Sequence, residues 1–173
     1  MSMNRIKKME GFSESLAALE RLTLYGNEIA KIEGLELLGQ SSSSLRVLDL
    51  SRNKISDTLH LVGAQNQGLR KTLEVLNASH NLIGEDQIDN IARFISSLQS
   101  LKSLDLYGNP LCSEATYKFR LSAASSLERL DGFDLKPGSF IRGRLDTLRK
   151  EWETAKLVEE THEQAQKWIE AER

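Results

Sequence analysis

The sequence predicts an α/β solenoid in which short parallel strands stack into one curved sheet. The first observation is a pattern of the form Leu-x-x-Leu-x-Leu-x-x-Asn, which occurs four times with one alanine in place of a leucine. The four copies end at Asn27, Asn53, Asn81 and Asn109. The second observation is the period, because these asparagines follow one another after 26, 28 and 28 residues. One strand and one return segment need about this length to complete a coil.

This pattern and period are typical of a leucine-rich-repeat solenoid with a curved parallel sheet. Alternate side chains of a strand point to opposite faces, so the inner apolar residues of each copy are expected to face the core. They are Leu22 and Leu24, Leu48 and Leu50, Leu76 and Ala78, and Leu104 and Leu106. Each asparagine is expected to turn inward and to hydrogen-bond backbone groups that a turning chain leaves unpaired. We therefore interpret the asparagines as structural, not as a catalytic or metal-binding cluster.

The repeat continues beyond the four full copies at both ends. Residues 4–12 match residues 27–35 in the pattern Asn-x-Ile-x-Lys-apolar-Glu-Gly-apolar, so the chain is expected to open in the second half of a coil, with a poorly protected edge. The strand pattern returns at residues 127–132 and then stops. A terminal repeat must cover the last apolar layer of a solenoid. The side chains expected to do so are Tyr117, Phe119, Leu121, Leu127, Leu130 and Phe133.

Two helices are predicted. Within residues 86–98 the apolar side chains recur at i, i+3 and i+4, which indicates an amphipathic helix with one face on the core. The second helix follows Pro137 and Gly138, begins after a plausible N-cap at Ser139, and contains no further proline. The sequence thus divides into a repeat domain with its cap, residues 1–138, and a C-terminal helix, residues 139–173.

Residues 139–173 have a seven-residue apolar repeat. One series is Ile141, Leu148, Ala155, His162 and Ile169, and the other is Leu145, Trp152, Glu159 and Gln166. The first turns are expected to fold back on the cap through Phe140, Ile141 and Leu145, while the far end is expected to project. We interpret the projecting part as the start of a coiled coil that supports a weak homodimer. A solvated, charged helix is the alternative.

The concave face of the solenoid, formed by the outward strand positions and the residues that follow them, is the candidate binding site. Tyrosine and arginine are the residue types most often found as binding hot spots. The candidate protein-binding residues are Arg21, Tyr25, Asp49, Arg52, Asn77, Asp105, Tyr107 and Arg129. Any such solenoid must place polar residues on this face, so a purely solvating role is the alternative.

Composition and motifs narrow the function classes. The formal net charge of −2 argues against a nucleic-acid partner, and the absence of a long apolar run argues against a membrane span. Cys112 is the only cysteine, which is typical of a reducing cytoplasmic compartment. The three histidines lack metal-ligand spacing, and no nucleotide-binding or metalloprotease motif occurs. We therefore expect a protein that is not an enzyme and that uses no cofactor and no metal.

Three segments carry a resemblance to a known family. The half-repeat at residues 29–35, the run Gly108-Asn109-Pro110-Leu111-Cys112 and the terminal repeat at residues 127–132 resemble the SDS22-like class of leucine-rich repeats with its C-terminal cap, over residues 4–135. A narrower likeness is to centrosomal leucine-rich-repeat and coiled-coil proteins. The resemblance implies a non-catalytic interaction module of a scaffold at the cytoskeleton, centrosome, basal body or cilium, with a cytoskeletal or ciliary protein partner. The alternative is a regulatory subunit that holds an enzyme or motor, of the phosphatase-regulator or axonemal dynein light chain type.

Overall fold

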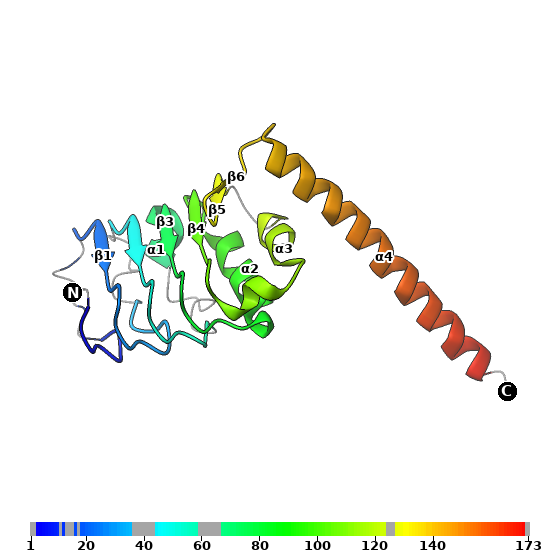
Figure 1. The fold of residues 1–173 in the computed structure, drawn as a ribbon, viewed down its shortest axis with the longest axis horizontal. Helices are drawn as coiled ribbons and strands as arrows, with labels where there is room; N and C mark the ends of the chain where they lie inside the picture. The colour runs from blue at the N-terminus through cyan, green and yellow to red at the C-terminus, as the bar shows by residue number, and fades with distance from the viewer. Residues whose placement is uncertain are drawn as a thin grey trace.

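The computed structural model describes residues 3–10, 12, 16, 18–35, 44–58, 67–123 and 127–171. Within these residues the strands form one six-stranded sheet in sequence order (Figure 1). The strands are β1 (Arg21–Thr23), β2 (Val47–Asp49), β3 (Val75–Asn77), β4 (Ser103–Asp105), β5 (Arg129–Leu130) and β6 (Phe133–Asp134). Strands β1 to β5 pair in parallel, each with the next, so the predicted parallel sheet is confirmed.

The core is a stack of leucines contributed one strand at a time. Leu22, Leu48, Leu76, Leu104 and Leu130 lie opposite one another in the strand register, and all five are buried. Because every coil adds the same apolar layer, each layer is covered by its two neighbours. The alternation expected from the sequence is therefore present in all four full repeats, including the one that carries Ala78.

A second ladder, made of asparagines, joins the coils at the turn after each strand. Asn53 shows the arrangement: its Nδ2 donates to the carbonyl of Leu50 at 2.9 Å and to that of Leu24 in the preceding coil at 3.0 Å. Its Oδ1 accepts the N–H of Ile29 at 3.1 Å. Asn81 and Asn109 repeat these three contacts one and two coils later. The predicted inward, structural role of the asparagines is thus confirmed.

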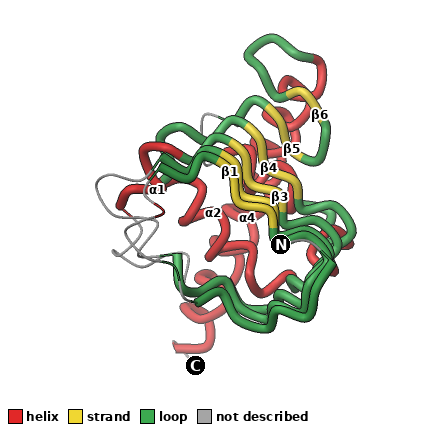
Figure 2. The backbone as a smooth tube through the Cα atoms, turned by 90° about the vertical axis from the view of Figure 1, so that its left-hand side faces the viewer, coloured by secondary structure: helices red, strands yellow, loops and turns green. Residues whose placement is uncertain are grey.

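Short helices lie in the segments that connect the strands. They are α1 (Gln67–Thr72), η4 (Glu85–Gln87), α2 (Ile88–Ser97), η5 (Pro110–Ser113) and α3 (Tyr117–Ala123). Figure 2 shows α1 and α2 to the left of the sheet. In α2 the buried apolar residues are Ile88, Ile91, Phe94 and Ile95. The helix predicted for residues 86–98 is therefore present, and its apolar face packs on the core as expected.

The solenoid ends in a hairpin that the sequence interpretation did not include. Strand β6 pairs with β5 in the antiparallel sense across a two-residue turn, Asp131-Gly132. Both turn residues have positive φ, 50° and 78°, as a tight hairpin turn of the primed type requires. An Asp-Gly pair between short strands is itself a strong sequence signal for such a hairpin. The hairpin reverses the chain and ends the parallel stack.

Five of the six side chains expected to cover the last layer are buried, and Phe133 is not. Tyr117, Phe119, Leu121, Leu127 and Leu130 belong to the core. Phe133 is 42% exposed and lies on the outward side of β6, with Lys118 Nζ 4.1 Å from its ring centroid. The reason is the hairpin: Phe133 pairs with the buried Leu130 but stands on a strand that runs back along the surface.

The C-terminal helix α4 (Phe140–Ala171) spans 32 residues and projects from the cap (Figure 1). Ser139 caps it, because its Oγ accepts the N–H of Arg142 at 3.2 Å. Ile141 and Leu145 pack on the core as expected, and Leu148 does so as well. Phe140 is 86% exposed, so that part of the prediction is wrong. Phe140 is the first helical residue and faces away from the cap, whereas the buried stripe starts one position later. No helix among the described residues carries an apolar stretch long enough to cross a membrane.

Candidate protein-binding face

The parallel register aligns the candidate residues in columns across the sheet. Arg21, Val47, Val75, Ser103 and Arg129 form the first column. Thr23, Asp49, Asn77 and Asp105 form the second. The structure therefore brings Asp49, Asn77 and Asp105 side by side. Arg21 and Arg129 are both exposed but lie at opposite ends of the stack, so they cannot act on one small group.

The second column has a structural function that the sequence interpretation missed. Asp49 Oδ1 accepts the N–H of Ser51 at 3.0 Å, Asn77 Oδ1 that of Ser79 at 3.0 Å, and Asp105 Oδ1 that of Tyr107 at 3.1 Å. Each side chain thereby stabilises the turn two residues after itself. The signal was an Asp or Asn at the same place in three repeats, directly ahead of the turn. One oxygen of each group is therefore committed to the fold.

Asp131 lies beside this column but closes the cap. Its Oδ1 accepts the N–H of Leu106 at 2.6 Å, and its Oδ2 accepts the hydroxyl proton of Tyr117 at 2.6 Å. In the earlier coils the equivalent N–H groups, such as that of Ala78, donate to a carbonyl of the next strand. The carboxylate of Asp131 replaces that carbonyl where the strand ends. Burial and the hydrogen bond to Asp131 raise the pKa of Tyr117, so the phenol stays protonated.

Asp105 is the electrostatically perturbed member of the face. Partial burial is the main cause that raises the pKa of its carboxyl above the ordinary value, and the nearby charge of Asp131 acts in the same direction. The N–H of Tyr107 and the charge of His80 oppose this shift. Two carboxylates next to each other favour a cationic partner group, because a cation relieves their mutual repulsion.

The residues after the strands form a ridge of aromatic and basic side chains, which consists of Tyr25, Arg52, His80 and Tyr107. Arg52 lies over the ring of Tyr25 at 6.0 Å, and His80 packs edge-on against Tyr107 with ring centroids 5.5 Å apart. Arg52, His80 and Tyr107 are exposed, and Tyr107 is 63% exposed. The ridge combines the two residue types that dominate binding hot spots.

Arg52 and His80 occupy a backbone conformation that favours glycine. Their φ values are 53° and 54°, and the equivalent positions in the neighbouring repeats are Gly26 and Gly108, with φ of 68° and 78°. A side chain at positive φ costs roughly 1 kcal/mol. Gly108 has a further reason to be glycine, because a Cβ there would lie 2.5 Å from Nδ1 of His80. The two intermediate repeats thus carry large, exposed side chains where glycine would fit with less strain.

A charge ladder precedes the strands at the other border of the sheet. Its members alternate in sign from coil to coil: Glu20, Arg46, Glu74, Lys102 and Glu128. Arg46 donates to Glu74 Oε1 through Nε at 2.8 Å and also through Nη2. On the other side, Lys102 Nζ lies 3.3 Å from Glu74 Oε2. The hydrogen bond from Arg46 is the main cause that lowers the pKa of Glu74. This alternation is readable in the sequence once the repeats are aligned.

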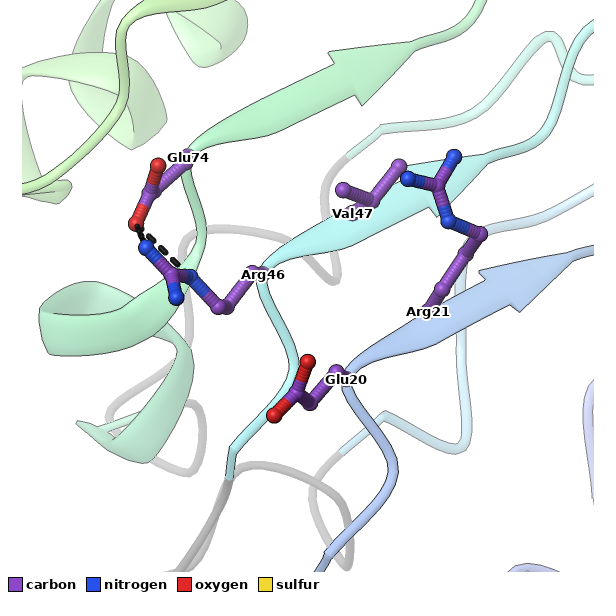
Figure 3. Close-up of a pocket in the computed structure, with 5 residues that line it drawn as sticks. All are labelled: Glu20, Arg21, Arg46, Val47 and Glu74. Atoms are coloured by element: carbon purple, nitrogen blue, oxygen red, sulfur yellow. Dashed lines mark hydrogen bonds and ion pairs between the residues drawn. The ribbon is translucent and has the colours of Figure 1, made fainter.

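A hollow of about 250 Å³ lies at the β1 end of this ladder (Figure 3). Its lining residues are Glu20, Arg21, Arg46, Val47 and Glu74. Figure 3 shows Arg46 turned toward Glu74, while Arg21 extends beside Val47 and away from the ladder. Of the two guanidinium groups, only that of Arg46 is held by an ion pair among the described residues. Nothing in the described parts of the chain forms a cluster of three or more potential metal ligands.

Comparison with known proteins agrees with this geometry. Residues 44–63 match the Leucine Rich Repeat family model. A chain in the crystal structure of the Drosophila melanogaster SNF/U2A' complex is similar in fold, with a TM-score of 0.62 and 19% sequence identity. The alignment covers 79% of this chain and 74% of that chain. The repeat period, the leucine and asparagine ladders and these two matches lead to one conclusion: this chain has a leucine-rich-repeat fold.

Proposed function

We propose that this protein is a non-catalytic protein–protein interaction module that binds its partner on the concave face. The observation that carries the proposal is the ridge of Tyr25, Arg52, His80 and Tyr107, whose side chains are held on a rigid sheet border and include two in a strained backbone conformation. Strained, exposed residues are tolerated where function requires them. The structural relative supports the proposal, since its structure is a complex of proteins.

The chemistry of the face defines the partner's surface. The ridge offers aromatic rings and cations, and the second column offers carboxylates beside the half-buried Val47 and Val75. A partner that fits this face presents an amphipathic element with both signs of charge, with its apolar side over the valines. The mixed charge favours a specific protein surface over a uniformly charged polymer.

We further propose that the module belongs to a scaffold at the centrosome, basal body or cilium in the cytoplasm. The support is the likeness of residues 29–35, 108–112 and 127–132 to the SDS22-like class, together with a 32-residue helix directly after the cap. In this arrangement the repeat domain binds the partner and the helix connects the domain to the rest of the scaffold.

Capture of proteins from extracts of ciliated cells tests the binding face. The double variant Tyr107→Ala, Arg129→Ala should lose the partners of the wild-type protein while remaining folded. A matched control is Leu82→Ala, Arg93→Ala, which removes one exposed apolar and one exposed basic side chain away from the concave face. Equal loss of partners from both variants would contradict the proposal.

Arg52→Gly separates binding from folding. Glycine accepts the positive φ of this position, so the variant should be at least as stable as the wild type, with a gain of up to about 1 kcal/mol. We expect the same variant to bind the captured partner more weakly, because the ridge loses its cation. If the variant is more stable and binds the partner as tightly as the wild type does, Arg52 is not part of the binding site.

A further inference from the structure

The two edges of the sheet differ. Among the described residues, β1 and β6 each have one strand neighbour, but β6 is the short return strand of a hairpin on β5, whereas β1 is a parallel strand of the repeat. Figure 2 looks along the stack from the β1 end and shows β1 as the outermost strand. Unpaired edges attract further strands, so proteins usually cover or disrupt them.

The backbone groups at this edge match those that bind a strand elsewhere in the same sheet. Alternate residues of a parallel strand bond to opposite neighbours. Toward β2, Glu20 C=O accepts the N–H of Val47 at 3.0 Å and Leu24 N–H donates to Asp49 C=O at 2.8 Å. The N–H groups of Arg21 and Thr23 and the C=O of Thr23 point the other way, and none has a partner among the described residues.

Strand β3 shows what those groups can bind. In β3 the equivalent groups are engaged by β2: Val75 N–H donates to Arg46 C=O at 2.9 Å, and Asn77 C=O accepts the N–H of Leu50 at 2.7 Å. The open edge of β1 thus has the same donor and acceptor spacing as an edge that already holds a parallel strand.

Residues 3–6, ahead of β1, make the turn contacts of a coil that precedes the coil of β1. Met3 N–H donates to Tyr25 C=O at 2.7 Å, as Gly26 N–H does to Ser51 C=O at 3.0 Å one coil later. Ile6 N–H donates to Asn27 Oδ1 at 3.1 Å, the contact that Ile29 makes with Asn53. The turn of a preceding coil is therefore present, and the strand position above it is vacant among the described residues.

The charge ladder indicates which strand fits. Glu20 is exposed, ends the alternating series, and makes no ion pair within the described parts of the chain. In the ladder Glu74 has a basic residue on both sides, Arg46 and Lys102. A strand placed on the open side of Glu20 would continue the alternation if it carried a lysine or arginine there. Leu22 is also the most exposed of the five stacked leucines, because 7% of its surface is accessible to solvent, against 1% for Leu48.

We propose that the open edge of β1 binds an extended segment of a partner protein as an additional parallel strand, with a basic side chain against Glu20. Backbone hydrogen bonds to Arg21 and Thr23 provide the attachment, and the Glu20 contact selects the register. This site is separate from the ridge on the concave face, so each of the two proposals can fail alone.

Strand β2 of the same chain gives the probe, because it carries Arg46 and already pairs with the β3 edge. A synthetic peptide that copies residues 44–51, Ser-Leu-Arg-Val-Leu-Asp-Leu-Ser, should bind the full chain. Amide hydrogen exchange followed by NMR should then show new protection at Arg21 and Thr23. Binding without protection of these two amides would place the peptide elsewhere and overturn the proposal.

N-methylated peptides provide a matched backbone test. In the protein, Leu50 N–H points toward the strand that follows β2, while Val47 N–H points toward β1. Methylation at the peptide's Leu50 position should weaken binding about tenfold, because it removes the donor to Thr23 C=O. Methylation at the Val47 position should leave binding unchanged, because that group faces solvent. Equal effects of the two methyl groups would overturn the parallel register.

A charge exchange tests the contact with Glu20. The peptide with Arg46→Glu should bind about threefold more weakly to the wild-type chain and recover on a Glu20→Lys chain. Tyr107→Ala should leave peptide binding unchanged, since the ridge is not involved. Loss of peptide binding in Tyr107→Ala, or a dimer that persists in sedimentation experiments after residues 156–173 are removed, would overturn the assignment of a partner segment to this edge.

Discussion

At the scale of single residues, the fold depends on side chains that replace backbone hydrogen-bond partners. Asn53 satisfies two carbonyls and one N–H from two coils, Asp49 and Asp105 each hold the turn that follows them, and Asp131 takes the place of a missing strand carbonyl. A solenoid turns at every coil and leaves such groups unpaired each time, so the same solution recurs with the repeat.

Asn53→Ala should therefore destabilise the protein far more than its small volume change suggests. The substitution leaves the N–H of Ile29 without its acceptor in a buried turn, at a cost of roughly 1–3 kcal/mol. It also removes one of the two amide donors from each of the carbonyls of Leu24 and Leu50, which keep Asn27 and Asn81. Thermal or urea unfolding measures the loss. Lys54→Ala is the control, since it removes only an exposed ion pair with Glu28 and should cost less than about 1 kcal/mol. Similar losses for both variants would refute the structural role of the asparagine ladder.

Asp105→Asn should increase stability at neutral pH. The folded-state pKa of Asp105 lies above its ordinary value of 3.8, so its ionisation favours the unfolded state as the pH rises through this interval. Asparagine keeps the acceptor for Tyr107 N–H, as Asn77 does for Ser79 in the preceding coil. The gain should be a few tenths of a kcal/mol, on the order expected for a partly exposed charge, and should vanish below the ordinary pKa. Unfolding at a series of pH values checks this, and a gain that is independent of pH would contradict it.

At the scale of elements, the repeat predicted the parallel strands and α2 well, because their signals are periodic. The aligned leucines gave both the strand positions and the buried face, and the spacing of Ile88, Ile91 and Ile95 gave the helix. The β6 hairpin and the exposure of Phe133 were missed, since they depend on how the stack ends and not on the repeat. The Asp-Gly turn was the available signal for the hairpin.

Leu104→Ala and Tyr107→Ala compare the two faces of one repeat. Leu104 is buried between the layers of Leu76 and Leu130, so its truncation should cost roughly 2–5 kcal/mol. Leu76→Ala should behave in the same way. The side chain of Tyr107 lies largely in solvent, so Tyr107→Ala should lower the free energy of unfolding by less than about 1 kcal/mol. Chemical denaturation gives the three values, and a comparable loss at Tyr107 would mean that the assigned faces are incorrect.

At the scale of the whole molecule, the repeat domain carries a helix whose described side chains are exposed in its outer part. Trp152 still packs on Phe119, with ring centroids 5.6 Å apart, but the described side chains from Glu153 onward are exposed. Leu157 and Val158 are each 65% exposed. The heptad positions His162, Gln166 and Ile169 lie outside the described side chains. The candidate face was only partly predictable: the columns followed from the repeat, whereas the ridge contacts and the closing role of Asp131 depend on turn geometry.

Removal of residues 156–173 should leave the thermal midpoint unchanged and abolish self-association. The reason is that the exposed apolar residues at the far end contribute nothing to the core but can pair with a second helix. Sedimentation over a concentration series should show a weak dimer for the full chain and a monomer for the shortened one. A full chain that stays monomeric at high concentration would contradict the coiled-coil interpretation of α4.

Site-specific photo-cross-linking tests the central claim, that the concave face binds the protein partner, most directly. Replacing Tyr107 by benzoylphenylalanine should disturb the fold little, because the tyrosine side chain is aromatic and 63% exposed. The same replacement at the exposed Leu157 on α4 is the matched control. We expect the partner to be cross-linked from position 107 and not from position 157. Cross-linking from position 157 alone would contradict the account and place the partner on the helix.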